Sequence, residues 1–222
     1  MEPEKRHLTT RVTLTRDLEA LRSKVVNIGS ASGQALGIFI SSLSVDTDFV
    51  QKQVASIVHE QTEVVNKLEL DCMRVLSLQQ PLLKDLRVVI GALQVSSHLA
   101  RLLELLERLT VITSSIEDKS SIPHELREIS ENCNLLLSDA MSAFENGSTE
   151  VIQKLLKKNE QLNLLQDTSV KELVKRMAKE SSDKIETDAQ LLTCIRYLER
   201  IGDSISVMAK QIYFIYTGKK IS

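Results

Sequence analysis

The chain is poor in glycine, proline and aromatic residues, and it has no excess of positive charge. Its 222 residues include seven glycines, three prolines and no tryptophan, and aromatic residues make up only 3%. So little turn-forming and aromatic material disfavours a sheet protein, whereas the abundance of Leu, Ile, Val, Ala, Glu and Lys favours helices. The formal net charge of −2 provides no basic field for nucleic acid or anionic lipid.

Cysteines and long apolar runs are scarce as well. Cys72, Cys133 and Cys194 are odd in number and far apart, so they form neither a disulfide framework nor a metal-type cluster. No uncharged apolar run approaches ~18 residues, and the charged N-terminus has no signal-peptide core. We therefore expect a soluble cytoplasmic protein whose cysteines pack as small apolar groups.

Motifs that would carry catalysis are also missing. The sequence contains no glycine-rich phosphate-binding loop, no nucleophile elbow and no Ser/His/Asp order. The four histidines are scattered, with no pair at metal-binding spacing. These absences predict that the protein is not an enzyme.

What the sequence does contain is helical periodicity, interrupted only by short polar or Gly/Pro segments. Asp46 or Thr47 can cap the second helix, Ser121 the fourth, and Ser148 or Thr149 the fifth, after a C-terminal cap at Gly147. The third helix is apolar almost all round, so we expect neighbours on several sides. The predicted helices span residues 13–43, 49–78, 83–116, 122–146, 149–181 and 183–218.

The polar stretch at residues 117–123 is the best candidate link between two halves of the chain, each with three long helices. We therefore predict an all-α fold of two tandem antiparallel three-helix bundles, residues 1–117 and 118–222.

Two carboxylates in the last predicted helix, Glu199 and Asp203, are the most informative local feature. They are four residues apart and share one helix face, where like charges repel unless something positive lies between them. They flank Gly202, which belongs to an apolar stripe and suggests a close approach of another helix. That stripe consists of Leu191, Ile195, Leu198, Gly202, Ile205, Ala209 and Ile212.

Two explanations of this pair follow from the spacing alone. Arg196 precedes Glu199 by three residues and Arg200 precedes Asp203 by three, so ordinary ion pairs within the helix could neutralise both carboxylates. Alternatively, the carboxylates bind a cation together with oxygen ligands of the fifth helix. The candidates there, at helical spacing, are Asn159, Asn163 and Asp167.

The sequence resembles the PhoU family of phosphate-uptake regulators along nearly its whole length. The opening helix, the start of the third helix and the closing helix each carry part of the resemblance. The matching residues are Arg11, Asp17, Leu18 and Leu21; Leu78-Gln79-Gln80-Pro81 with Asp85-Leu86-Arg87; and Leu198-Glu199-Arg200-Ile201-Gly202-Asp203 with Tyr213, Thr217 and Gly218.

This resemblance implies a non-enzymatic regulator with six helices and with metal ions at the Glu-x-x-x-Asp motifs. It implies three partners as well: a phosphate ABC transporter, a sensor histidine kinase and a second copy of the chain in a homodimer. The protein would associate with the membrane only through the transporter and the kinase. The metal would be divalent or trivalent, and the sequence does not distinguish iron, zinc and magnesium.

The chain departs from the family pattern in both halves. In the first motif, Leu99 to Glu104, Ala100 replaces the metal-binding Glu, and Glu104 has Arg101 and Arg108 at helical spacing, which favours an ion pair over a ligand. In the second motif Ser204 and Val207 replace polar residues. Metal binding is therefore expected in the C-terminal bundle.

Two other functions compete with the metal-binding regulator. One is a metal-free helical scaffold or dimerisation module, which the analysis of bound metal would distinguish. The other is a carboxylate-bridged di-metal oxidase, which requires Glu-x-x-His motifs from two helices. The sequence contains no such motif, so this alternative ranks last.

Overall fold

The computed structural model describes the backbone of residues 3–44, 48–179 and 182–221, and the side chains of residues 12–44, 49–179 and 184–221. Within these residues the chain is helical, with no strand, and one turn of 3-10 helix, η1 (Lys119–Ser121), precedes the fourth helix. The α-helices of the described residues are α1 (Pro3–Ser42), α2 (Asp48–Gln79), α3 (Lys84–Ser115), α4 (His124–Asn146), α5 (Thr149–Met177) and α6 (Ser182–Thr217).

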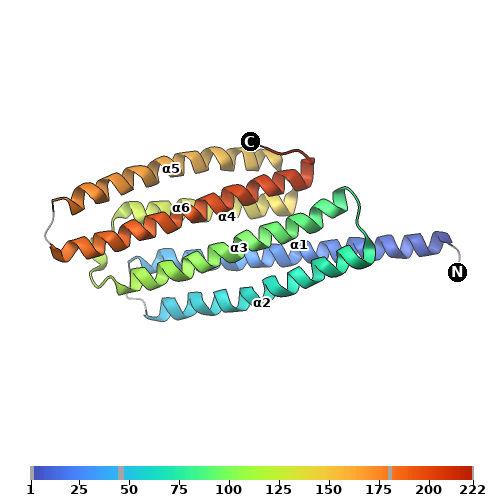
Figure 1. Cartoon of the computed structure of the whole chain (residues 1–222), viewed down its shortest axis with the longest axis horizontal. Coiled ribbons are helices and arrows are strands. Elements are labelled where there is room, and N and C mark those ends of the chain that lie inside the picture. Colours follow the sequence, from blue (N-terminus) through green and yellow to red (C-terminus); the bar gives the residue numbers. More distant parts are fainter. Residues whose placement is uncertain (1–2, 45–47, 180–181, 222) are drawn as a thin grey trace.

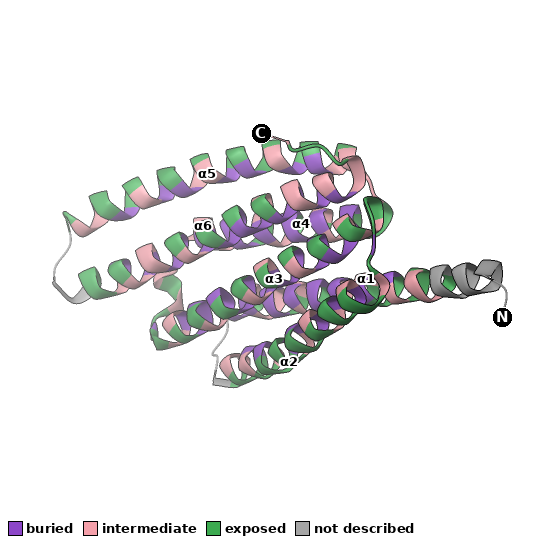
Figure 2. Cartoon of the chain, turned by 45° about the vertical axis from the view of Figure 1, so that its right-hand side comes forward, coloured by how far each residue is buried: buried purple, intermediate pink, exposed green. Residues whose placement is uncertain are grey.

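The six helices lie in two groups of three, as Figure 1 shows. Helices α1, α2 and α3 pack against one another, and so do α4, α5 and α6; the groups meet where α3 packs on α6 and α1 on α4. Buried residues of all six helices form one hydrophobic cluster, and they face inward in Figure 2. The all-α, six-helix prediction is confirmed, while the domain division between residues 117 and 118 stays a prediction.

Helix α3 is the most extensively covered helix of the first group. It packs against α1, α2 and α6, as the apolar pattern predicted. By length and composition alone α3 could cross a membrane, but 56% of its most apolar window is buried inside the bundle. Its apolar character is therefore explained by the helices around it.

Most helix boundaries lie within two residues of the predicted ones. Helix α5 ends at Met177, four residues before the predicted end at 181, and two other predictions differ as well. Helix α1 begins at Pro3, ten residues before the predicted start, since proline is well tolerated at the first position of a helix. Ser121 is not the N-cap of α4: that position is Pro123, and Ser121 ends η1, whose start is capped by the Asp118 carboxylate. The predicted caps Asp46 and Thr47 lie outside the described residues.

The predicted apolar stripe of α6 is the buried seam of the second group. Each of its side chains is fully buried, and Gly202 is buried as well. The predicted turn between α4 and α5 is also present, because Gly147 has a φ of 72° and its N–H donates to the Ala143 carbonyl at 2.9 Å. Only glycine adopts this left-handed conformation readily, so the turn is well defined by the sequence.

Several residues that carry the family resemblance hold helix ends together. The Gln79 amide, at the end of α2, donates to the Asp17 carboxylate of α1. The Arg87 guanidinium of α3 donates to the Ile215 carbonyl of α6 at 3.3 Å. A cation at the C-terminal end of a helix is favourable because the last carbonyl groups lack partners within the helix.

Tyr216 makes a second connection at the same end of the bundle. Its hydroxyl group donates to the Phe144 carbonyl near the end of α4, and the Arg22 guanidinium of α1 lies 5.8 Å from the centre of its ring. Burial raises the pKa of Tyr216, and the Arg22 charge opposes that effect. One aromatic residue of α6 thus joins α1 and α4, which belong to different groups.

Candidate functional site

Helices α5 and α6 approach closely where Gly202 faces Asn159. A Cβ atom added to Gly202 would lie 3.1 Å from the Asn159 Oδ1 atom and 3.6 Å from the Leu162 Cδ2 atom. A Cβ atom would crowd the Asn159 oxygen, whereas its contact with Leu162 would be ordinary, so the glycine leaves room for the amide of α5. This close approach is the one that the position of Gly202 in the apolar stripe predicted.

The amide groups along this seam have no hydrogen-bond partners among the described residues. These unpartnered buried atoms are Asn159 Oδ1, Asn163 Oδ1, and both Oε1 and Nε2 of Gln166. An unsatisfied buried polar group costs about 1–3 kcal/mol, so such groups are rare in folded proteins and call for an explanation. Amide oxygens are suitable ligands for hard cations, and so the seam has the chemistry of a polar binding site.

Gln166 was not among the residues predicted from the sequence, although a signal for it exists. The buried residues of α5 recur at alternating steps of three and four, which is the period of a packed helix face. Asn159, Gln166 and Ser169 occupy positions of that face where an apolar residue would be expected. Asp167, which the sequence analysis included, is exposed.

The two carboxylates of α6 lie beside this seam in different electrostatic environments. The Arg196 guanidinium donates to the Glu199 carboxylate at 2.6 Å, so the first of the two predicted ion pairs is present. The second is absent: among the described residues neither Arg200 nor Asp203 makes an ion pair within 4 Å. Partial burial raises the pKa of Asp203, and the negative charge of Glu199 raises it further.

The degenerate first motif also differs from its predicted arrangement. Glu104 was expected to be neutralised by Arg101 and Arg108, yet no ion pair joins these side chains in the described part of the chain. The spacing allows such pairs, but the rotamers direct the groups into a pocket shared with Arg200 of α6. His59 and Glu63 of α2 are exposed and do not line this pocket.

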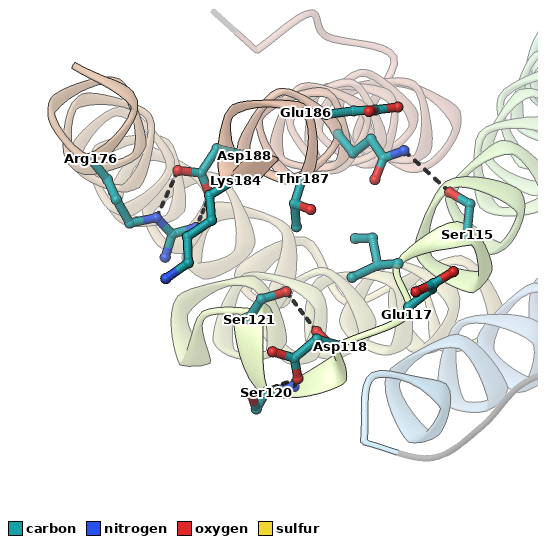
Figure 3. A pocket seen from close by; sticks show the side chains of 12 residues that line it. Ser115, Glu117, Asp118, Ser120, Ser121, Arg176, Lys184, Glu186, Thr187 and Asp188 are labelled. Carbon is teal, nitrogen blue, oxygen red and sulfur yellow. Dashed lines mark hydrogen bonds and ion pairs between the residues drawn. The ribbon is translucent and has the colours of Figure 1, made fainter. Parts of the chain in front are cut away.

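Another pocket, of about 580 Å³, lies at one end of the bundle between η1 and the adjoining ends of α5 and α6. Figure 3 shows its side chains. Arg176 donates to the Asp188 carboxylate, with Nε 2.8 Å from Oδ2, and the Asp118 carboxylate accepts from the Ser120 backbone N–H at 3.0 Å. Arg176 and Asp188 thus join α5 to α6, Asp118 caps η1, and none of the predicted ligands lines the pocket.

No cluster of three or more His, Cys, Asp or Glu side chains that could hold a metal occurs among the described residues. The three cysteines are buried, and burial raises the pKa of Cys133 to about 12.

Comparison with known proteins shows which proteins this chain resembles. A PhoU domain matches residues 126–212. The phosphate-specific transport system accessory protein PhoU homolog of Streptococcus pneumoniae is 26% identical over 77% of this chain and 81% of its own length. The corresponding homolog of Zymomonas mobilis is 25% identical over 92% of this chain and 87% of its own length.

Solved structures show the same fold. The crystal structure of the phosphate transport system regulatory protein PhoU from Streptococcus pneumoniae superimposes with a TM-score of 0.87, covering 94% of this chain and 99% of that chain at 20% identity. PhoU from Pseudomonas aeruginosa gives the same TM-score and identity, covering 92% of this chain and 99% of that chain. A PhoU domain thus matches part of this chain, and PhoU proteins are similar to it in sequence and in fold along most of its length.

Proposed function

We propose that this protein regulates phosphate uptake and the phosphate-starvation response. The observation that carries this proposal is the match with phosphate-specific transport system accessory proteins along most of the chain. PhoU proteins are non-enzymatic regulators. In this role the protein would act in the cytoplasm, as a homodimer, and would link a phosphate ABC transporter to a sensor histidine kinase.

A metal site at the α5–α6 seam is the finer part of the proposal. Glu199 and Asp203 would bind the ion through their carboxylates, and Asn159 and Asn163 would add amide oxygens. The unpartnered buried oxygens of the two asparagines support this ligand set. A cation would also relieve the repulsion between the two carboxylates, which contributes to the raised pKa of Asp203.

The chemistry of these donors limits which ions fit. All four offer oxygen, which suits a hard divalent or trivalent ion, and iron, zinc and magnesium all stay possible. Glu104 lies in a pocket with three arginines that repel cations. Asp167 and Asp203 are both exposed, but only Asp203 adjoins Gly202, which faces the unpartnered oxygen of Asn159. We therefore leave Glu104 and Asp167 out of the proposed site and confine the metal to the C-terminal half.

A metal-free helical scaffold is the alternative, and one observation favours it. Arg196 already neutralises Glu199 across 2.6 Å, so a cation would have to compete with a guanidinium for that carboxylate. The scaffold would still contact partners through its helical faces. Metal content per chain distinguishes the two alternatives.

Deletion of the protein from its host tests the regulatory role. Without a PhoU-type regulator, phosphate-uptake genes should stay expressed when phosphate is plentiful. The intact chain supplied on a plasmid should restore repression. Normal repression in the deletion strain would contradict the proposed role and would favour the scaffold.

A further inference from the structure

A pocket of about 450 Å³ opens between α3 and α6, where the two groups of helices meet. Three guanidinium groups line it: Arg101 and Arg108 from α3, and Arg200 from α6. The carboxylate of Glu104 and the hydroxyl of Ser97 complete its polar surface, beside apolar groups of α3. Two helices far apart in the sequence thus bring three positive charges to one concave surface.

These three arginines differ from all others whose side chains the structure describes. Each arginine outside the pocket has a partner: a carboxylate, a backbone carbonyl, a hydroxyl group or an aromatic ring. Those residues are Arg16, Arg22, Arg74, Arg87, Arg127, Arg176 and Arg196. Within the described residues, no hydrogen bond or ion pair engages the side chain of an arginine that lines the pocket.

The balance of charge in the pocket favours an anion. Arginine remains protonated at all physiological pH values, so three guanidinium groups and one carboxylate leave two positive charges in excess. A doubly charged phosphate group matches that excess. Its oxygens also accept paired N–H donors in the fork geometry that guanidinium groups offer.

We propose that this pocket binds a phosphate group between α3 and α6. Its volume is within the roughly 300–1,000 Å³ typical of small-molecule sites, so it accommodates inorganic phosphate or the phosphate of a small ester. The proposal rests on the geometry of the arginines and goes beyond the proposed regulatory role. It would give that role a direct contact with phosphate.

Isothermal titration calorimetry of the full chain with inorganic phosphate, at constant ionic strength, tests the proposal. Arg101→Gln and Arg200→Gln should each weaken phosphate binding about tenfold or more, because each removes charge-assisted hydrogen bonds. Glu104→Gln should strengthen it by removing the one negative charge. Lys171→Gln is the matched control, because Lys171 is an exposed cation of α5 away from the pocket.

Titration with glucose 6-phosphate, and with glucose as its control, distinguishes the source of the phosphate group. Tighter binding of the ester assigns the pocket to a phosphorylated metabolite, and tighter binding of the free ion assigns it to inorganic phosphate; both support the site. The absence of binding by either probe would overturn the proposal. So would equal weakening by Lys171→Gln, which would indicate general attraction to a charged surface.

The two proposals fail separately. Calorimetry of the arginine variants tests the phosphate pocket. Gene repression in the deletion strain tests the regulatory role, and neither result depends on the other. The arginines of the pocket are exposed, so circular dichroism should show unchanged helix content in these variants. Phosphate binding that survives both arginine substitutions would contradict the site even if the protein regulates phosphate uptake.

Discussion

The carboxamide oxygen of Asn159 lies against the backbone of Gly202, where an added Cβ atom would come within 3.1 Å of it. Gly202 directly precedes Asp203 on α6, so this contact brings the unpartnered oxygen of Asn159 close to the backbone beside Asp203. The glycine therefore has a packing role and a role in the candidate site. Because glycine has no side chain, the Asn159 oxygen can lie beside the carboxylate proposed to bind the metal.

Replacing Gly202 by Ala should test this contact through its coupling to Asn159. Alanine gains about 1 kcal/mol of helix propensity over glycine, but here crowding of the amide oxygen should cancel much of it. In an Asn159→Ala background the full gain should return. A double-mutant cycle from urea unfolding measures the coupling, and strictly additive effects would show that the contact carries no energy.

Asp203→Asn should stabilise the metal-free protein at neutral pH. The pKa of Asp203 is raised in the folded state from its ordinary value of 3.8, so the folded protein prefers the protonated form. The carboxylate therefore destabilises the fold increasingly as pH rises through the unfolded and then the folded pKa. Urea unfolding of both proteins should show the gain at pH 7 and its disappearance at acidic pH.

Asp167→Asn is the control for that comparison. Asp167 is exposed and unpaired among the described residues, as Asp203 is, but the residues one turn away on its helix are Asn163 and Lys171 rather than a carboxylate. Its removal should therefore not reproduce the gain. A gain of equal size from Asp167→Asn would attribute the effect to general charge reduction rather than to the surroundings of Asp203.

Tyr216→Phe should destabilise the protein by about 1 kcal/mol, because it removes the hydrogen bond to the Phe144 carbonyl and leaves the ring in place. Tyr213 belongs to the same helix, and its hydroxyl group has no hydrogen bond in the described part of the chain. Tyr213→Phe should therefore be close to neutral. Similar losses for both variants in thermal unfolding would contradict a specific contact between α4 and α6.

The three cysteines should be unreactive in the native protein. Burial raises the pKa of Cys72, Cys133 and Cys194 to about 12 each, so almost no thiolate is present near neutral pH. Ellman's reagent should label the folded chain only slowly and the urea-unfolded chain promptly. Rapid labelling of one cysteine without denaturant would indicate local opening of the helix around it.

Sequence periodicity predicted the helices because most have one buried apolar face, α3 being covered on several sides, and because most helix ends carry strong local signals. Gly147 and Pro81 illustrate this, since turn chemistry depends on neighbouring residues alone. The early start of α1 was missed because the charged segment before Thr13 has no clear apolar stripe. Helix propensity alone, without a buried apolar face, is a weak predictor of where a helix begins.

The candidate site was only partly predictable, because it depends on rotamers and on the rotation of one helix against another. The spacing allowed Arg200 to pair with Asp203, yet Arg200 lines the pocket shared with α3 instead. Gln166 emerged as an unpartnered buried amide only once the packed face of α5 was known. Contacts between helices far apart in the sequence leave no local periodic signal.

The most direct test of the proposed site is elemental analysis of protein purified without chelator, expressed as metal atoms per chain. We expect bound metal in the wild type, its loss when Glu199 and Asp203 are both replaced by Ala, and its retention in Glu104→Ala. A metal-free wild-type chain, or equal metal loss from both substitutions, would contradict a site confined to the α5–α6 seam.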